Sequence, residues 1–198
     1  MGDTPEDREL LLPNSVVALA RGRLMLARKP GSRVAPRDLA VFIVSVALWS
    51  LREMDAVDFS VSNSVRWLPF SSLMVGLRNT QVAEECIEKE LLNQVRMILS
   101  GRRYRPDHKV KVRELVREWL IDSAALSPTF GDPYREVLQL AFIRAKTASL
   151  DPGRLDTAAL RLASSWQIFL RHEPEIARRL QATVSSAIYS AAERDDGE

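Results

Sequence analysis

Apolar residues recur every three or four positions over most of the second half of the chain, a spacing typical of amphipathic helices. The first such stretch begins near Thr80, and its expected core-facing positions are Ala83, Ile87, Leu91, Val95 and Ile98. Acidic side chains lie between them, which predicts a solvated outer face carrying Glu84, Glu85, Glu88 and Glu90. The pattern therefore predicts a helix with a single buried side.

The same spacing continues to the end of the chain and predicts four more helices. One extends from about His108 to Ala125, with the expected core positions Val112, Leu115, Val116, Trp119 and Leu120. Residues that favour helix N-termini precede the other three. Asp132 and Pro133 are expected to open a helix over 133–149, Asp156 to cap a helix that extends to Leu170, and Pro174 to begin the last helix, which ends near Ala192.

The first half of the chain mixes helical and strand patterns. Residues 38–54 are apolar on nearly all sides, which predicts a central, buried helix with Asp38 as its N-cap. Val57, Phe59 and Val61 alternate with polar residues and predict a strand directly after this helix. A short strand is predicted over 22–29, and residues 62–79 are expected to form a loop or an irregular hairpin.

These elements predict a mainly α fold, with a single compact helical domain over residues 1–198 and a small N-terminal β-hairpin or winged-helix-like element. Hydrophobic residues make up 46% of the chain, which is enough for a sizeable core. Residues 1–9 and 193–198 are polar and are expected to be flexible tails. The longest nearly unbroken apolar run, Leu39 to Trp49, is too short to cross a bilayer. Because the chain also has only one cysteine, we expect a cytoplasmic protein.

The sequence lacks motifs for catalysis or metal binding. Its two histidines, His108 and His172, lie in different segments without further ligands at a metal-binding spacing. It has neither a glycine-rich phosphate-binding motif nor a nucleophile motif. The lone Cys86 is expected to be a small buried side chain. We therefore expect a protein that is not an enzyme and that uses neither a metal nor a cofactor.

Basic residues gather in two clusters, although the net charge of the chain is only +2. Residues 21–37 contain no acidic residue, and residues 102–117 contain two. Either cluster could be an ordinary solvated surface, or its arginines could bind phosphate groups through paired hydrogen bonds. The candidate anion- or lipid-binding residues are Arg28, Lys29, Arg33, Arg37, Arg102, Arg103 and Arg105. A helix that begins near residue 108 would also place Lys109, Arg113 and Arg117 on one face.

An apolar segment between residues 65 and 77 is a second candidate contact surface, because it carries Trp67 and Phe70. It either folds back onto the core or presents these side chains to a protein partner or a membrane. The other tryptophans lie on helical stripes and are expected in the core: Trp49, Trp119 and Trp166.

The order of these segments resembles the Golgi phosphoprotein family, whose bacterial members are often of similar length. The resemblance covers most of the chain and rests on ELLL at residues 9–12, LWSLREMDAVDF at residues 48–59 and the helical stretch 172–192. It implies a mostly helical, non-enzymatic domain. Eukaryotic members act as peripheral membrane adaptors that recognise phosphatidylinositol 4-phosphate through a basic pocket. Arg33 and Arg37 lie near a basic position of the family, whereas residues 82–95, which resemble its helix with paired arginines, are acidic here.

We therefore expect a non-enzymatic adaptor or interaction protein. The resemblance implies that it acts at the periphery of an anionic membrane, with phospholipid headgroups as partners beside a protein partner that the sequence does not identify. The alternative is a winged-helix nucleic-acid-binding protein, indicated by the helix–strand unit at residues 38–61 and the same arginines. The predicted helix is too apolar for a recognition helix, so nucleic acid is the less favoured partner.

Overall fold

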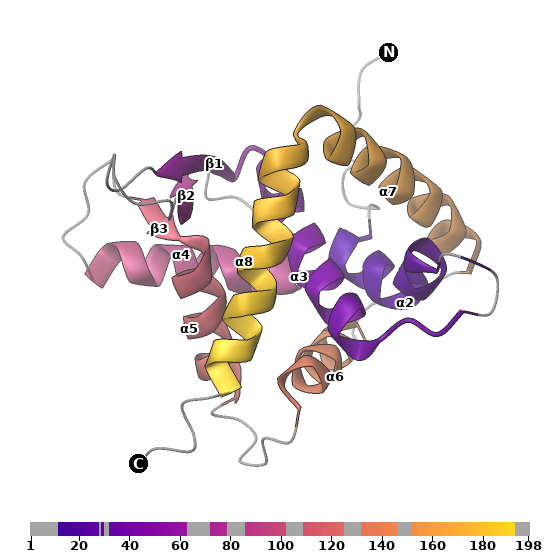
Figure 1. Cartoon of the computed structure of the whole chain (residues 1–198), viewed down its shortest axis with the longest axis horizontal. Coiled ribbons are helices and arrows are strands. Elements are labelled where there is room, and N and C mark those ends of the chain that lie inside the picture. The colour runs from indigo at the N-terminus through magenta and orange to yellow at the C-terminus, as the bar shows by residue number, and fades with distance from the viewer. Residues whose placement is uncertain are drawn as a thin grey trace.

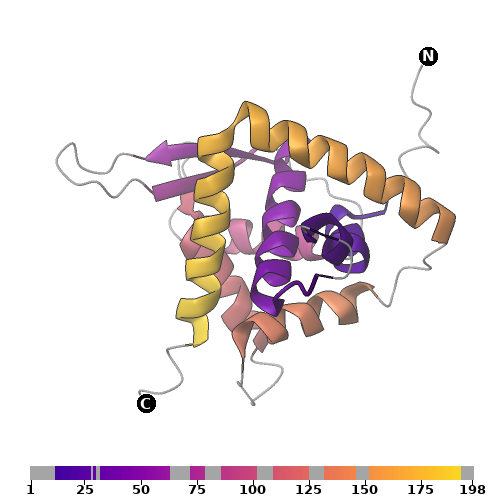
Figure 2. The same cartoon turned by 45° about the vertical axis from the view of Figure 1, so that its right-hand side comes forward.

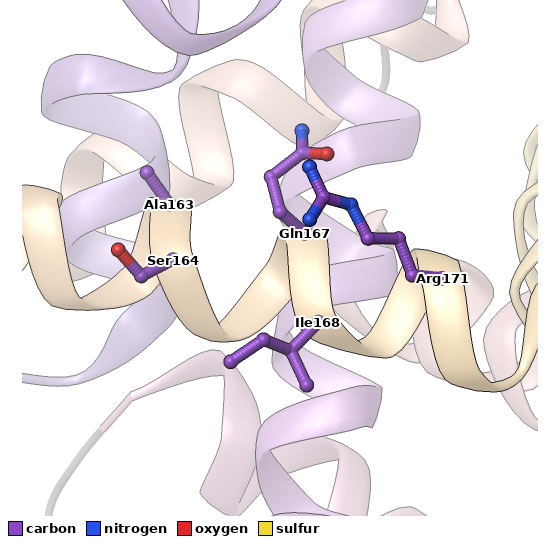
Figure 3. Close-up of a pocket in the computed structure, with 5 residues that line it drawn as sticks. All are labelled: Ala163, Ser164, Gln167, Ile168 and Arg171. Carbon is purple, nitrogen blue, oxygen red and sulfur yellow. The ribbon is translucent and has the colours of Figure 1, made fainter.

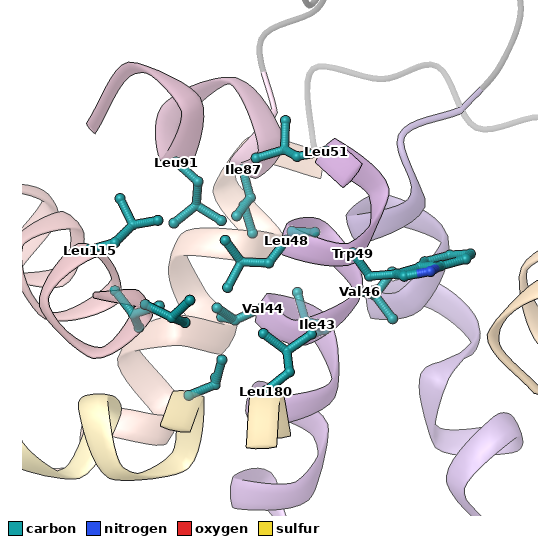
Figure 4. Packing of buried hydrophobic residues seen from close by; sticks show 14 of the residues in the cluster. Ile43, Val44, Val46, Leu48, Trp49, Leu51, Ile87, Leu91, Leu115 and Leu180 are labelled. Atoms are coloured by element: carbon teal, nitrogen blue, oxygen red, sulfur yellow. The ribbon is translucent and has the colours of Figure 1, made fainter. Parts of the chain in front are cut away.

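The central element of the molecule is one buried helix, α3 (Pro36–Glu53), which the other elements surround (Figure 1). The computed structural model describes residues 12–27, 29, 32–62, 72–78, 86–101, 109–124, 132–145 and 152–192. Twelve of the 18 residues of α3 are buried, because apolar side chains occupy all of its sides. Figure 4 shows Leu48 directed towards Ile87 and Leu91, whereas Trp49 points to the opposite side. The expected central, buried helix is confirmed.

The start of α3 differs from the expected one. Ala35 occupies the N-cap position and Pro36 is the first helical residue, so Asp38 lies within the first turn and is not the N-cap. Proline favours this first position because its φ angle is already helical and its missing N–H would have no partner there. The prediction was wrong because it gave the side chain of Asp38 more weight than the proline two residues earlier.

Helix α2 (Asn14–Leu26) occupies the region where a strand was predicted. Residues 22–26 belong to this helix, so the predicted strand over 22–29 is wrong for them, and residues 28, 30 and 31 lie outside the described part. The local alternation of apolar residues misled the prediction, because Val16, Val17 and Ala18 continue a buried helical face upstream. Gly22 allows α2 to approach α3 closely, since a Cβ at residue 22 would lie 2.8 Å from Leu39 Cδ1.

A small antiparallel sheet follows α3, with the strand order β1 (Val57–Ser62), β2 (Ser72–Leu77), β3 (Lys109–Lys111). The strand predicted from alternation is confirmed as β1. The region expected to be a loop or an irregular hairpin contains β2, which pairs regularly with β1 from Val57 opposite Leu77 to Ser62 opposite Ser72. The sequence did not indicate β2 as a strand, because its glycine interrupts the apolar pattern.

The packing around position 76 of β2 explains why a glycine occupies it. It lies between Asp58 of β1 and Lys109 of β3 in the register of the sheet. Lys109 Nζ donates to Asp58 Oδ2 and to Ser60 Oγ, both at 3.0 Å, so these side chains reach across β2. A Cβ at residue 76 would collide with Asp58 Oδ1. Only glycine leaves this path free without a shift of the neighbours.

Three helices pack on the side of α3 next to the sheet: α4 (Ile87–Gly101), α5 (Val112–Ala124) and α8 (Pro174–Ala192). The five core positions predicted for α5 are all buried, as are the predicted positions Ile87, Leu91 and Val95 of α4. The helix expected from residue 108 begins at Val112 instead, because residues 109–111 pair with β2. The expected start of α8 at Pro174 and its end near Ala192 are confirmed.

Two further helices, α6 (Pro133–Ala145) and α7 (Pro152–His172), lie along two edges of the molecule (Figure 2). The predicted cap of α6 is confirmed, because Asp132 Oδ1 accepts the Tyr134 backbone N–H at 3.0 Å. The predicted cap of α7 is wrong: the helix begins at Pro152, and Asp156 lies one turn inside it. Proline at the first helical position again outweighed the acidic residue.

The inner side of α7 joins an aromatic cluster that ties it to α3. Trp166 contacts Phe42 and Trp49 edge to face, with ring centroids 5.7 and 5.5 Å apart, and lies 5.3 Å from Phe169. The predicted core positions of Trp49, Trp119 and Trp166 are confirmed. In the described part of the chain no helix is both long and apolar enough to cross a membrane. The mainly helical fold with a small sheet is confirmed.

Candidate functional site

The basic cluster of residues 21–37 is divided among several neighbours. Arg21 forms an ion pair with Asp156 of α7 at 2.6 Å. Arg37 donates a hydrogen bond to Ser185 Oγ of α8 at 3.0 Å, and its guanidinium lies 5.9 Å from the centre of the Tyr134 ring of α6. These two arginines therefore hold helices together on different sides of the molecule and do not converge on one ligand.

The other basic residues of this cluster extend into solvent. Arg23, near the end of α2, is exposed, and so are Lys29 and Arg33 on the connection between α2 and α3. Arg28 lies outside the described residues. The structure thus leaves a basic, exposed segment at the end of α2, and the ion pair between Arg21 and Asp156 places the end of α2 beside the first turns of α7.

The second predicted cluster is only partly described. Arg102, Arg103 and Arg105 lie outside the described residues, as do Trp67 and Phe70 of the predicted apolar segment and the tails 1–9 and 193–198. The shared helical face predicted for Lys109, Arg113 and Arg117 is wrong, because Lys109 belongs to β3 and pairs with Asp58. In Figure 1, β3 and the end of α4, which flank residues 102–108, lie across α3 from the connection between α2 and α3.

The outer face of α7 is a basic and apolar surface that the sequence reading did not identify. Leu160 and Ile168 are exposed to 72% and 57%, and Arg161 and Arg171 are exposed as well. A shallow depression of about 420 Å³ lies here, lined by Ala163, Ser164, Gln167, Ile168 and Arg171. Figure 3 shows Gln167 and Arg171 directed towards each other on one flank of α7 and Ile168 on the other flank.

Charge on α7 is unbalanced along its length. Asp156 is its one acidic residue and is paired with Arg21, so residues 157–172 carry Arg161, Arg171 and His172 without a carboxylate. The residues on the inner side are buried in the core: Leu155, Leu162, Trp166 and Phe169. The sequence signal for this surface is the lack of acidic residues over 157–172, whereas the prediction for Trp166 concerned only the inner side of the helix.

A buried polar cluster lies apart from these surfaces, where α2 and α4 begin. Glu88 was predicted on the outer face of its helix, and this is wrong, because it is 2% exposed. Its Oε1 accepts the Ser15 backbone N–H at 2.8 Å and its Oε2 accepts the Ser15 hydroxyl at 2.5 Å. Since α2 has no side-chain cap of its own, Glu88 satisfies a donor of its first turn from 73 residues away.

Cys86 is buried next to Glu88, as its predicted role as a small core residue requires. Burial raises the pKa of its thiol from 9.0 to about 12, and the nearby Glu88 carboxylate adds to the increase. A thiol in this state is a poor nucleophile at neutral pH. The cluster therefore stabilises the junction of α2 and α4, and its closed environment gives a ligand no access.

The exposed basic and aliphatic side chains of α7 can bind a partner through electrostatic and apolar contacts. Within the described residues, no three side chains of the types His, Cys, Asp and Glu come together as a metal site. Comparison with models of protein families, with curated proteins and with solved structures finds no match to this chain. The features of the described surface that bear on function are therefore the exposed basic residues of α2, of α7 and of the connection after α2.

Proposed function

We propose that this protein is a non-enzymatic binding protein that acts at the surface of an anionic membrane. One observation carries the proposal: residues 21–35 and 152–172 together contain a single acidic residue, Asp156, and the structure pairs it with Arg21. Besides Arg154 and His172, the exposed basic side chains of these segments are Arg23, Lys29, Arg33, Arg161 and Arg171, and Asp156 is the one carboxylate that the same segments carry.

Such a surface suits reversible membrane binding. Each Lys or Arg close to an anionic leaflet contributes about 1 kcal/mol of binding free energy. Five such residues would contribute up to about 5 kcal/mol of binding free energy if all reached the headgroups. Because this contribution is electrostatic, salt should weaken the association. Arginine is well suited to this role, because its planar guanidinium can make two parallel hydrogen bonds to one phosphate.

The adaptor part of the proposal adds a protein partner to the membrane. It is supported by the resemblance of the segment order to the Golgi phosphoprotein family and by the mainly helical fold that this resemblance implies. Phosphatidylinositol 4-phosphate is one headgroup to include in a test, and phosphatidylserine provides the same negative charge without the phosphorylated inositol. The comparison of the two separates recognition of one headgroup from general attraction to negative charge.

Co-sedimentation with liposomes tests the proposal. At low salt we expect the full-length protein to pellet with vesicles containing phosphatidylserine or phosphatidylinositol 4-phosphate and to stay in the supernatant with pure phosphatidylcholine. Raising the salt concentration should weaken the binding. Absence of binding to both anionic vesicles at low salt would rule the proposal out. Tight binding to duplex DNA with a steep salt dependence, together with no vesicle binding, would favour the nucleic-acid alternative instead.

A further inference from the structure

We propose that the outer face of α7 is the part of the protein that lies on the bilayer, with Leu160 and Ile168 entering the headgroup region between Arg161 and Arg171. This inference rests on the function proposed above and names the surface and the binding mode. The proposed contact depends on apolar burial as well as on charge, because Leu160 and Ile168, which are exposed to 72% and 57%, are both expected to enter the membrane.

The spacing of these residues on α7 supports a single contact face. Leu160 and Arg171 are 11 residues apart, and Arg161 and Ile168 are seven apart, and both separations return to nearly the same side of an α-helix. Ser164 lies four residues from both Leu160 and Ile168, in the middle of this face. The face therefore alternates aliphatic and cationic side chains around a small polar centre.

The shape of this face favours a flat partner. Among the described residues, those that line its depression all belong to α7, so no other described element adds a second wall that could form a groove for a helix or a peptide. In Figures 1 and 2, α7 lies along an edge of the molecule, and only its inner side is covered by α2 and α3. A bilayer surface can contact such an edge along its whole length, whereas an amphipathic helical peptide binds in a hydrophobic groove.

The chemistry of this face selects a membrane over a nucleic acid. Phosphate groups are common to both, and arginine binds both. Nucleic-acid surfaces offer bases to aromatic side chains, whereas this face presents aliphatic Leu160 and Ile168 and buries its aromatic residues in the core. Aliphatic side chains gain free energy by entering the boundary between headgroups and acyl chains, as in amphipathic helices that lie in the plane of a membrane.

An environment-sensitive dye on α7 tests the contact directly. Cys86 is buried and the pKa of its thiol is raised to about 12, so a thiol-reactive dye should label only an introduced surface cysteine. We expect Ser164→Cys labelled with such a dye to show a blue shift and a several-fold increase in emission when anionic vesicles are added. The matched control is Ser186→Cys on the exposed side of α8, which should show neither change.

Paired substitutions test the energetics. Replacing Arg161 and Arg171 together by Gln should weaken binding about 25-fold, since each arginine contributes about a factor of five. Lys111→Gln with Arg113→Gln changes the net charge equally at two exposed positions of β3 and α5, and should weaken binding much less. All variants alter exposed side chains, so thermal unfolding should show an unchanged fold.

The aliphatic pair separates this inference from simple charge attraction. Leu160→Ser with Ile168→Ser should lower the vesicle affinity about 10-fold and remove the fraction of binding that resists salt. Met97→Ser with Ile143→Ser removes equally exposed apolar side chains from α4 and α6 and should leave binding unchanged. If the wild type binds vesicles but the dye at residue 164 does not respond, or the Leu160 and Ile168 variant binds normally, the inference is wrong and the proposed function stands. If the wild type does not bind anionic vesicles, both are wrong.

Discussion

Glu88 is the residue whose replacement should most clearly test the packing of α2 against α4. It is 2% exposed, and its two carboxylate oxygens accept the backbone N–H and the hydroxyl of Ser15, which is equally buried. Glu88→Ala would leave both donors without an acceptor in a site that water does not reach. A buried donor that loses its partner costs about 1–3 kcal/mol. The two donors together predict a loss of about 2–6 kcal/mol in the free energy of unfolding.

Glu88→Gln should be much milder. Its amide oxygen can accept the Ser15 N–H, and its amide nitrogen can donate to the Ser15 hydroxyl oxygen once the hydroxyl rotates. Only the charge-assisted part of the two hydrogen bonds is lost, which predicts a cost of about 1–2 kcal/mol. Ser15→Ala should cost less in the Glu88→Ala background than in the wild type, because its hydroxyl has already lost its acceptor.

Urea unfolding followed by far-UV circular dichroism would measure these differences. In thermal unfolding of a chain of this length, a loss of about 4 kcal/mol in the free energy of unfolding should lower the midpoint temperature by roughly 8–16 °C. Glu53→Ala, which changes an exposed glutamate at the end of α3, is the matched control and should stay within about 0.5 kcal/mol of the wild type. If Glu88→Ala is as mild as this control, the carboxylate does not satisfy buried donors and the reasoning is refuted.

Three further substitutions test other parts of the structure. Gly76→Ala should cost about 1–3 kcal/mol, because its Cβ displaces Asp58 from Lys109. Lys109→Met should then cost less in that background than alone in urea unfolding, and an equal cost in both would contradict the bridge across β2. Cys86→Ala should change the pH dependence of stability: the pKa of the thiol is raised from 9.0 to about 12, so its contribution is full below pH 9 and is lost as the pH rises towards 12. When the free energy of unfolding is plotted against pH, the slopes for wild type and Cys86→Ala should therefore differ only above pH 9. A difference in slope at neutral pH would contradict this reasoning. Trp166→Ala should cost about 3–5 kcal/mol and reduce the near-UV circular dichroism of the aromatic cluster, whereas Trp166→Phe, the control, should cost clearly less.

Local patterns predicted the elements whose burial depends on their own side chains. The five core positions of α5 and the burial of α3 on all sides follow from the spacing of apolar residues within each helix. This spacing is a local property of the sequence. Helix starts were less certain from sequence. Asp132 caps α6 as expected, whereas Pro36 and Pro152 begin α3 and α7 before the acidic residues that were expected to cap them. Where a proline and an acidic residue compete, the proline set the first turn in both of these helices.

Features that depend on distant partners could not be read in the same way. Glu88 has the sequence context of a solvated glutamate, and only the arrival of Ser15 from α2 provides the donors that make its burial favourable. Residues 109–111 continue a helical pattern, and β2 draws them into the sheet through Val110 and the bridge from Lys109 to Asp58. In both cases a hydrogen-bond partner far along the chain outweighed the local preference.

The sequence by itself determined a mainly helical protein with one buried central helix, because the period of apolar residues specifies which side of each element leaves water. It also determined that basic residues gather near residues 21–37 and are unopposed in residues 157–172. The tertiary structure decided which of these charges remain available. It used Arg21 and Arg37 to join helices and left Arg161 and Arg171 exposed beside Leu160 and Ile168. The physical reason is that a charge binds a partner only where packing has not already given it one within the fold.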